Sequence, residues 1–234
     1  MIKAITFDFW NTLYVIPADQ SLSERRVKDM GTVLEAAGLK VAPQLMREAF
    51  KYGWYKAWYQ QRAYGKEISP SGQVQYIIEK LGVKLSSATE DKIFLAYTGT
   101  LLEVPPVINH DVLETLPALA QKYKLAIICN TGATPGTVLR KIVNKDKLDV
   151  YFKVMVFSDE VGFAKPSTQI FNYTLQHLGI ENHAAVHIGD DPITDAIGAK
   201  RAGMTSVWLA PEEQWAVPEA DYHVCSVKEL LTLF

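Results

Sequence analysis

The stretch that decides the fold is residues 2–13, which read IKAITFDFWNTL. Its first half is a short apolar run of the kind that forms a buried strand. The run ends at Asp8, and a polar turn with Asn11 and Thr12 follows. Burying an unpaired charge is unfavourable, and ligands of open α/β sheets bind just outside the carboxyl ends of the strands. We therefore expect Asp8 to be catalytic; for this stretch alone, a turn or helix-capping aspartate is the alternative.

The composition is that of an ordinary globular protein with one large or two small domains. Of its 234 residues, 48% are hydrophobic and 21% are charged, and the net charge is -2. No run of Lys or Arg stands out, which argues against a nucleic-acid partner. Met1 leads directly into the first strand and no long apolar run follows, so we expect a cytoplasmic protein without membrane contact. With Cys129 and Cys225 as its only cysteines, the chain has no disulfide framework to expect, and we predict a monomer or a homodimer.

A group of helices follows the first strand. Between about residues 21 and 100 we find no convincing strand, and apolar residues at helical spacing predict four helices instead. The first runs from Ser21 to a stop at Gly38, the second begins at Pro43, and the others cover residues 72–81 and 88–102. A Pro-containing connector at residues 103–107 then marks a module boundary.

Strands and helices alternate beyond this connector. Apolar runs with amphipathic helices between them predict strands at residues 125–129, 154–157, 184–188, 206–209 and 222–225. Such an alternation is typical of a parallel sheet that helices cover on both faces. The predicted fold is therefore a Rossmann-like α/β core, formed by residues 1–13 and 105–234, with an all-helical cap inserted at residues 14–104.

Polar side chains gather where the predicted strands end. Asp8 follows the first strand, and residues 129–132 (CNTG) follow the second. Lys165 comes later, and residues 189–191 (GDD) follow a further strand, with Asp195 one helical turn beyond them. In a parallel sheet these ends meet at one crevice. Carboxylates that close repel one another unless a cation neutralises them, and oxygen ligands without His or thiolate favour Mg²⁺.

These motifs resemble those of the haloacid dehalogenase-like hydrolase superfamily over essentially the whole chain. The first motif of that family is D-x-D-x-T, and residues 7–13 (FDFWNTL) are similar to it. The predicted helical insert stands where subfamily I of this family carries its cap. Further stretches are similar to the other motifs of the family: residues 127–130 (IICN), Lys165 with Pro166, residues 189–195 (GDDPITD) and residues 198–204 (GAKRAGM).

The resemblance implies a Mg²⁺-dependent phosphatase of small phosphorylated metabolites. Asp8 would attack phosphorus and form an aspartyl-phosphate, since a carboxylate can act as a covalent nucleophile. Mg²⁺ would be held by Asp8, Asp190 and the backbone carbonyl of Trp10, and would stabilise the transferring phosphoryl group. Closure of the cap would exclude bulk water and choose the substrate.

The resemblance also assigns the remaining motif residues. Asp191 and Asp195 would orient Lys165 or a metal-bound water. The phosphate oxygens would be bound by Thr12, Cys129, Asn130, Thr131 and Lys165.

Two residues depart from the family pattern. Trp10 stands where the phosphatases carry a second Asp as general acid and base, and an indole N–H is no exchangeable acid near neutral pH. Losing a general acid–base lowers the rate by roughly 10²–10⁴-fold, so we expect slow turnover of alkyl phosphates and a smaller deficit for leaving groups that are stable as anions. Cys129 stands where the family has Ser or Thr, and is either a weak hydrogen-bond donor or a small buried hydrophobe.

Trp10 keeps two other classes of function open. The dehalogenase branch of the superfamily carries an aromatic Tyr at this position, and a 2-haloacid dehalogenase needs no metal. A non-catalytic binding protein that kept the fold and the metal site is the other alternative. Because a site that binds no cation has little use for so many carboxylates, we favour the phosphatase over the dehalogenase.

The predicted cap carries aromatic and basic side chains that form no motif. Phe50, Trp54 and Trp58 recur at fourfold spacing, which favours the core of the cap over a substrate pocket. His187 alternates within a predicted strand, which favours a packing role over a ligand. One cap arginine could reach a substrate anion, but we expect these side chains to be solvated: Arg25, Arg26, Arg47 and Arg62.

Overall fold

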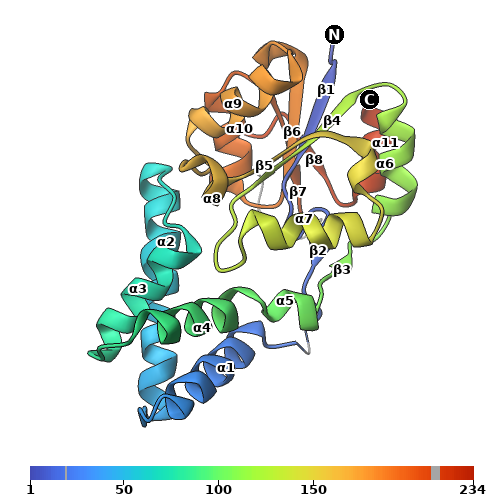
Figure 1. The fold of residues 1–234 in the computed structure, drawn as a ribbon. Helices are drawn as coiled ribbons and strands as arrows, with labels where there is room; N and C mark the ends of the chain where they lie inside the picture. Colours follow the sequence, from blue (N-terminus) through green and yellow to red (C-terminus); the bar gives the residue numbers. More distant parts are fainter. Residues whose placement is uncertain (19, 212–216) are drawn as a thin grey trace.

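A six-stranded sheet forms the centre of the structure, a computed structural model that describes residues 1–18, 20–211 and 217–234 (Figure 1). Every pair of neighbouring strands in it is parallel. The strands lie close to the bounds expected from the sequence, and the α/β class is confirmed. In spatial order they are β5 (Phe152–Phe157), β4 (Lys124–Cys129), β1 (Ala4–Phe7), β6 (Ala185–Gly189), β7 (Thr205–Leu209) and β8 (Tyr222–Val224).

Helices cover both faces of this sheet. Ile5 and Phe7 of β1 point into the apolar layer on one face, and Ala4 points into the layer on the other. Because successive side chains of a strand point to opposite faces, both layers hold β1 in place up to the residue before Asp8. The covering helices are α6 (Val112–Ala120), α7 (Gly136–Lys145) and α11 (Leu230–Leu233) on the first face, and α9 (Thr168–Leu178) and α10 (Gly198–Arg201) on the second.

A second group of helices lies beyond the carboxyl ends of the strands (Figure 1). Ser21 caps its first helix and Pro43 begins the second, as predicted. The single helix expected at residues 88–102 is wrong in its extent, because the chain breaks into two helices at Gly99. None of the helices in the described ranges has the length and apolarity needed to cross a membrane. The group comprises α1 (Leu22–Ala36), α2 (Pro43–Tyr64), α3 (Pro70–Leu81), α4 (Ser87–Thr98) and α5 (Thr100–Glu103).

Two short strands stand where the chain enters and leaves this helical group. β2 (Tyr14–Val15) pairs antiparallel with β3 (Val107–Ile108). Sequence reasoning missed both strands, because two residues are too few to show a period. They lie beside the expected ends of the cap at residues 14 and 104, and the domain boundaries themselves stay a prediction.

The loop after α2 touches the core of the molecule. The carbonyl of Gly65 accepts a hydrogen bond of 2.8 Å from the N–H of Ala164. A Cβ at Gly65 would lie 2.4 Å from the Cβ of Ser167, and its φ is +60°, so this contact requires glycine. Glu67 in the same loop is 8% exposed and accepts a hydrogen bond of 2.8 Å from the Gln61 amide. Burial raises the pKa of Glu67 to about 7.

Candidate active site

A cavity of about 890 Å³ opens at the carboxyl ends of the central strands. Asp8 follows β1, Asn130 follows β4 and Asp190 follows β6. The chain runs from β1 to β4 and β5 on one side, and the later strands β6, β7 and β8 lie on the other. Ligands of open α/β sheets bind at such a reversal of strand order. On the core side, the cavity is lined by Asp8, Asn130, Thr131, Lys165, Asp190, Asp191 and Asp195, among others.

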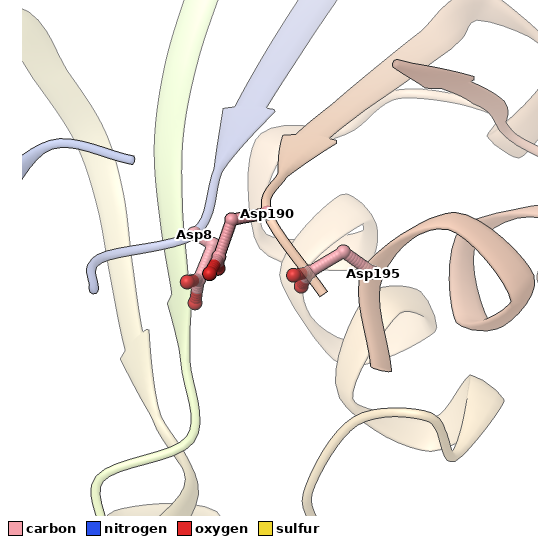
Figure 2. A group of neighbouring side chains, drawn as sticks. All are labelled: Asp8, Asp190 and Asp195. Atoms are coloured by element: carbon pink, nitrogen blue, oxygen red, sulfur yellow. The ribbon is translucent and has the colours of Figure 1, made fainter. Parts of the chain in front are cut away.

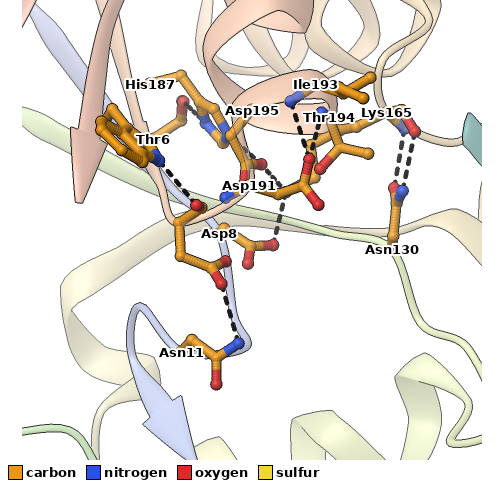
Figure 3. A network of polar contacts seen from close by, with 12 residues as sticks. Thr6, Asp8, Asn11, Asn130, Lys165, His187, Asp191, Ile193, Thr194 and Asp195 are labelled. Atoms are coloured by element: carbon orange, nitrogen blue, oxygen red, sulfur yellow. Dashed lines mark hydrogen bonds and ion pairs between the residues drawn. The ribbon is translucent and has the colours of Figure 1, made fainter. Parts of the chain in front are cut away.

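Lys165 bridges two of these carboxylates, in the network that Figure 3 shows. Its Nζ donates to Oδ1 of Asp8 and to Oδ1 of Asp195, at 2.5 Å in both cases. Lys165 and Asp195 are each 1% exposed, and Asp8 is 6% exposed. Burial raises the pKa of Asp8 to about 8, with Lys165 acting in the opposite direction. Burial acts to raise the pKa of Asp195 as well, but Lys165 and a histidine hold that pKa well below its usual range.

Asp195 owes its position to a close approach to β6. A Cβ on Gly189 would lie 2.2 Å from Cγ of Asp195, so this position requires glycine. Asp191 begins the π-helix Pro192–Ile197, and its Oδ1 accepts hydrogen bonds from two backbone N–H groups of that helix. The N–H of Asp191 in turn donates to Oδ2 of Asp195 at 2.9 Å. Asp191 therefore fixes the start of the helix on which Asp195 stands.

Two residues of the sheet, His187 and Thr6, hold Asp195 in place. His187 on β6 is 1% exposed, and its Nε2 lies 3.1 Å from Oδ1 of Asp195. Its Nδ1 lies 2.8 Å from Oγ1 of Thr6 on β1. Burial lowers the pKa of His187, so we assign a neutral ring with its proton on Nε2, where the carboxylate accepts it. His187 packs inside the core as expected and also orients a residue of the site.

Asp8, Asp190 and Asp195 form an acidic cluster that could hold a cation (Figure 2). One carboxylate oxygen of each lies within 4.8 Å of the others. Asn11 donates to Oδ2 of Asp190 at 2.9 Å, and the indole of Trp208 donates to the backbone carbonyl of Asp190 at 2.9 Å. Burial, and then the charge of Asp195, raises the pKa of Asp190 to about 6. Because these are hard oxygen donors, the residues present fit the predicted Mg²⁺.

The loop after β4 holds the backbone of Lys165. The side chain of Asn130 donates to the Lys165 carbonyl at 2.9 Å and accepts from the Lys165 N–H at 2.8 Å. The N–H of Thr131 donates to Oγ of Ser158 at 2.9 Å. Asn130 is thus a positioning residue for Lys165, and phosphate binding by Asn130 and Thr131 stays a prediction.

Two other residues with a predicted phosphate-binding role, Thr12 and Cys129, are not among the described residues that line the cavity. Both side chains are fully buried. The Thr12 hydroxyl has no hydrogen-bond partner among the described residues. Cys129 belongs to the apolar core, and burial raises the pKa of its thiol. Phosphate binding by Thr12 and Cys129 stays a prediction.

The cap side of the cavity carries aromatic as well as basic side chains, and its tryptophans correct one sequence prediction. Phe50 belongs to the cap core as expected. Trp54 and Trp58 are 44% and 38% exposed instead, and they line the cavity. A fourfold spacing shows that side chains share one face of a helix, but this face of α2 extends beyond the cap core. Trp10 lines the same cavity from the core and packs against Phe9, with 4.8 Å between ring centroids.

Two cap arginines make contacts that the sequence did not predict. Arg26 was expected to be solvated, but it is 7% exposed and donates to the Tyr97 carbonyl at 2.8 Å. Arg62 forms an ion pair with Asp191 of the core. Its guanidinium carbon also lies 5.3 Å from the centroid of the Trp58 ring. Arg62 therefore connects the cap side of the cavity with its core side.

Sequence reasoning missed several side chains that hold the acidic residues in place. Asn11 has a positive φ of 55°, which Asn tolerates better than most residues. This bend turns its amide toward Asp190, and the polar turn after β1 was the available signal. No local signal pointed to Trp208 or Arg62, because their contacts join different elements, 18 residues apart for Trp208 and 129 residues apart for Arg62.

The parallel sheet, the helical group above its carboxyl edge and the Asp–Lys–Asp cluster together define a capped α/β enzyme. The family model of haloacid dehalogenase-like hydrolases matches residues 2–203, and the chain belongs to this family of hydrolases.

Similar proteins cover most of the chain. Rhythmically expressed gene 2 protein of Drosophila melanogaster is 27% identical over 231 residues, which are 92% of this chain and 85% of that protein. A glyceraldehyde 3-phosphate phosphatase of Methanopyrus kandleri is 28% identical over 216 residues, with coverage of 88% and 83%. Among solved structures, a 2-haloacid dehalogenase from Pseudomonas syringae has a similar fold, with a TM-score of 0.75, 22% identity and coverage of 100% and 98%.

Proposed function

We propose that this hydrolase is a Mg²⁺-dependent phosphatase of small phosphorylated metabolites with Asp8 as its nucleophile. The observation that carries the proposal is the buried bridge from Asp8 through Lys165 to Asp195, beside Asp190. A carboxylate in this position can attack phosphorus and hold the phosphoryl group as an aspartyl-phosphate. Burial acts to lower the pKa of Lys165, but the two aspartates raise it, so the ammonium stays charged and can neutralise phosphate oxygens.

The groups that would hold Mg²⁺ are Asp8, Asp190 and the backbone carbonyl of Trp10. When bound, the ion supplies positive charge that offsets the repulsion between nucleophile and phosphate and stabilises the transferring group. Asp195 is bonded to Lys165 and His187, so we assign it the task of orienting Lys165. Asn130 holds the backbone of Lys165 for the same purpose.

Two facts support phosphate chemistry. The cluster brings three carboxyl groups to one lysine, and a bound cation would favour their ionised forms, that of Asp8 included. The relative from Methanopyrus kandleri is named as a phosphatase of a small phosphorylated sugar. Cleavage of a carbon–halogen bond needs neither a cation nor this many acids, so the dehalogenase is the alternative that an experiment must exclude.

The test is hydrolysis of phosphate monoesters with graded leaving groups, measured as phosphate release with Mg²⁺ and with a chelator. We expect turnover that requires Mg²⁺, slows as the leaving group becomes poorer, and disappears in Asp8→Asn. Asp91→Asn on α4 removes an exposed carboxylate and should keep the activity. Absence of turnover with every ester would overturn the proposal, and halide release from a 2-haloacid in chelator would establish the dehalogenase instead.

A further inference from the structure

Among the residues that the structure describes, three tryptophans line the cavity that holds Asp8: Trp10, Trp54 and Trp58. Trp54 and Trp58 stand one turn apart on α2, and their rings stack with 6.1 Å between centroids and 20° between planes. They are 44% and 38% exposed, and exposed apolar surface inside a cavity marks a place where a ligand is covered. The cap side of the cavity therefore offers an apolar surface to a ligand.

The ring of Trp58 is fixed by its neighbours. The guanidinium of Arg62 lies 5.3 Å from its centroid, and the same arginine is paired with Asp191 of the core. Trp54 stacks with the ring as well. A ring that is already immobile loses little freedom when a flat ligand stacks on it, and aromatic pairs gain energy beyond their buried area. The surface formed by Trp54 and Trp58 therefore favours a planar ring over an alkyl chain.

Trp10 restricts the same substrate at the bond that breaks. It lies two residues after Asp8, and its indole has no proton to give to a leaving oxygen near neutral pH. Among the described residues, the carboxyl group that lines the cap side of the cavity is that of Glu24, and it is paired with Arg47. Trp10 therefore favours a leaving group whose oxygen is stable as an anion. A phenol has a pKa of roughly 10, like tyrosine, whereas water, the parent of the alkanols, has a pKa of roughly 16.

From these two restrictions we infer that the substrate is an aryl phosphate monoester, whose ring stacks on Trp58 and Trp54. This inference rests on the proposed phosphatase function and narrows its substrate class. In the first step an oxygen of Asp8 bonds to phosphorus, while the bond from phosphorus to the phenolic oxygen breaks and its electron pair leaves with the phenolate. Water then attacks phosphorus, inorganic phosphate leaves Asp8, and the proton released from water balances the one that the phenolate takes from solvent.

Four monoesters separate recognition of the ring from acidity of the leaving group. Phenyl phosphate has both properties, benzyl phosphate has the ring with a poor leaving group, hexafluoroisopropyl phosphate has an acidic alcohol without a ring, and ethyl phosphate has neither. We expect the ring to lower KM and the acidic leaving group to raise kcat, so phenyl phosphate has the highest kcat/KM. Equal KM for phenyl and hexafluoroisopropyl phosphate, or equal kcat for phenyl and benzyl phosphate, would overturn the inference.

Substitutions on α2 test the aromatic wall directly. Trp54→Ala and Trp58→Ala should each raise KM for phenyl phosphate roughly three- to tenfold, with kcat and the KM for ethyl phosphate unchanged. Tyr222→Ala is the matched control, because Tyr222 lies on β8, is 44% exposed like Trp54, and is not among the described residues that line the cavity. A loss of similar size with all four esters would indicate a structural role for the tryptophans and contradict the inference.

Two probes that cannot be hydrolysed separate this inference from the proposed function. Phenylphosphonate and ethylphosphonate are titrated into the Mg²⁺-loaded protein by calorimetry. Tighter binding of phenylphosphonate by the wild type, lost in Trp58→Ala, supports the ring site; if no ester is then turned over, only the phosphatase function falls. Equal binding of the two phosphonates would overturn the ring site and leave the phosphatase function standing.

Discussion

The side of the cavity formed by the core (the core wall) and the side formed by the cap helices (the cap wall) differ in burial, charge and hydrogen bonding. On the core wall, Asp8, Lys165 and Asp195 are almost fully buried and bonded to one another. On the cap wall, Trp54 and Trp58 are apolar and exposed to the cavity. Groups that are locked by their neighbours hold a reactive geometry, whereas exposed rings select a ligand by contact. A substitution on the core wall should therefore change turnover and stability, and one on the cap wall should change KM.

The largest effect is expected for Lys165→Met, which removes the cation between two carboxylates. Removing one partner of a buried ion pair lowers stability by about 3–5 kcal/mol, and Asp8 and Asp195 then repel each other. We expect the free energy of unfolding to fall by this amount and kcat to fall at least about a hundredfold, as when one stabilising donor is lost from an active site. Urea unfolding and steady-state kinetics measure the two effects.

Lys200→Met is the matched control for this substitution. Lys200 also makes an ion pair, at 2.7 Å to Asp221, but the two side chains are 42% and 33% exposed. An exposed pair contributes about 0–1 kcal/mol, so this variant should keep its stability and its activity. Equal losses of stability and activity in the two lysine variants would contradict the larger contribution that we assign to the buried ion pair.

Trp10→Asp should raise turnover where the leaving group is poor. A carboxylic acid at this position can donate a proton to the leaving oxygen, which is worth roughly 10²–10⁴-fold in rate. We expect such a gain in kcat with ethyl phosphate and little gain with phenyl phosphate. Trp10→Asn has a similar size without an ionisable group, and an equal gain in both variants would show that space rather than acid catalysis limits turnover.

Much of the core wall could be predicted from the sequence, because strands and their ends follow from local patterns. Apolar runs locate the strands, and the carboxyl ends of parallel strands must share one edge of the sheet. Asp8, Lys165 and Asp190 could therefore be placed in one site before their contacts were known. The strands β2 and β3 could not be found in this way, because two residues show no period.

The cap wall could not be predicted, because helical spacing does not say what a face packs against. Trp54 and Trp58 share a face with a core residue of the cap, yet they reach the cavity. The contact of Arg62 with Asp191 spans 129 residues of sequence, and that of Asn11 with the neighbouring Asp190 spans 179. Such contacts depend on the packing of whole elements, which local patterns do not contain.

A smaller effect, on stability alone, is expected for Glu67→Gln in the loop after α2. Burial raises the pKa of Glu67 from 4.5 to about 7. Between these values the folded chain keeps the proton and the unfolded chain releases it, so the free energy of unfolding falls as pH rises from about 4.5 to 7. Gln cannot ionise, so at pH 8 the variant should be more stable than the wild type by about 2–3 kcal/mol.

Urea unfolding at pH 5 and at pH 8 measures this difference, which should fall to less than about 1 kcal/mol at the lower pH. Glu79→Gln replaces an exposed carboxylate on α3 and should show no such dependence on pH. A Glu67→Gln variant with wild-type stability at pH 8 would contradict the raised pKa of Glu67 in the folded chain.

The smallest effect is expected for Arg62→Met, which removes the contact between the two walls. Its pair with Asp191 is partly exposed, with side chains at 24% and 29%, so stability should fall by less than about 1 kcal/mol. Because Trp58 loses the cation beside its ring, KM for phenyl phosphate should rise roughly two- to fivefold with kcat unchanged. Arg140 combines an ion pair and a ring contact within the core, so Arg140→Met should lower stability by a similar amount without changing KM. A change in kcat in Arg62→Met, or in KM in Arg140→Met, would show that the walls do not act separately.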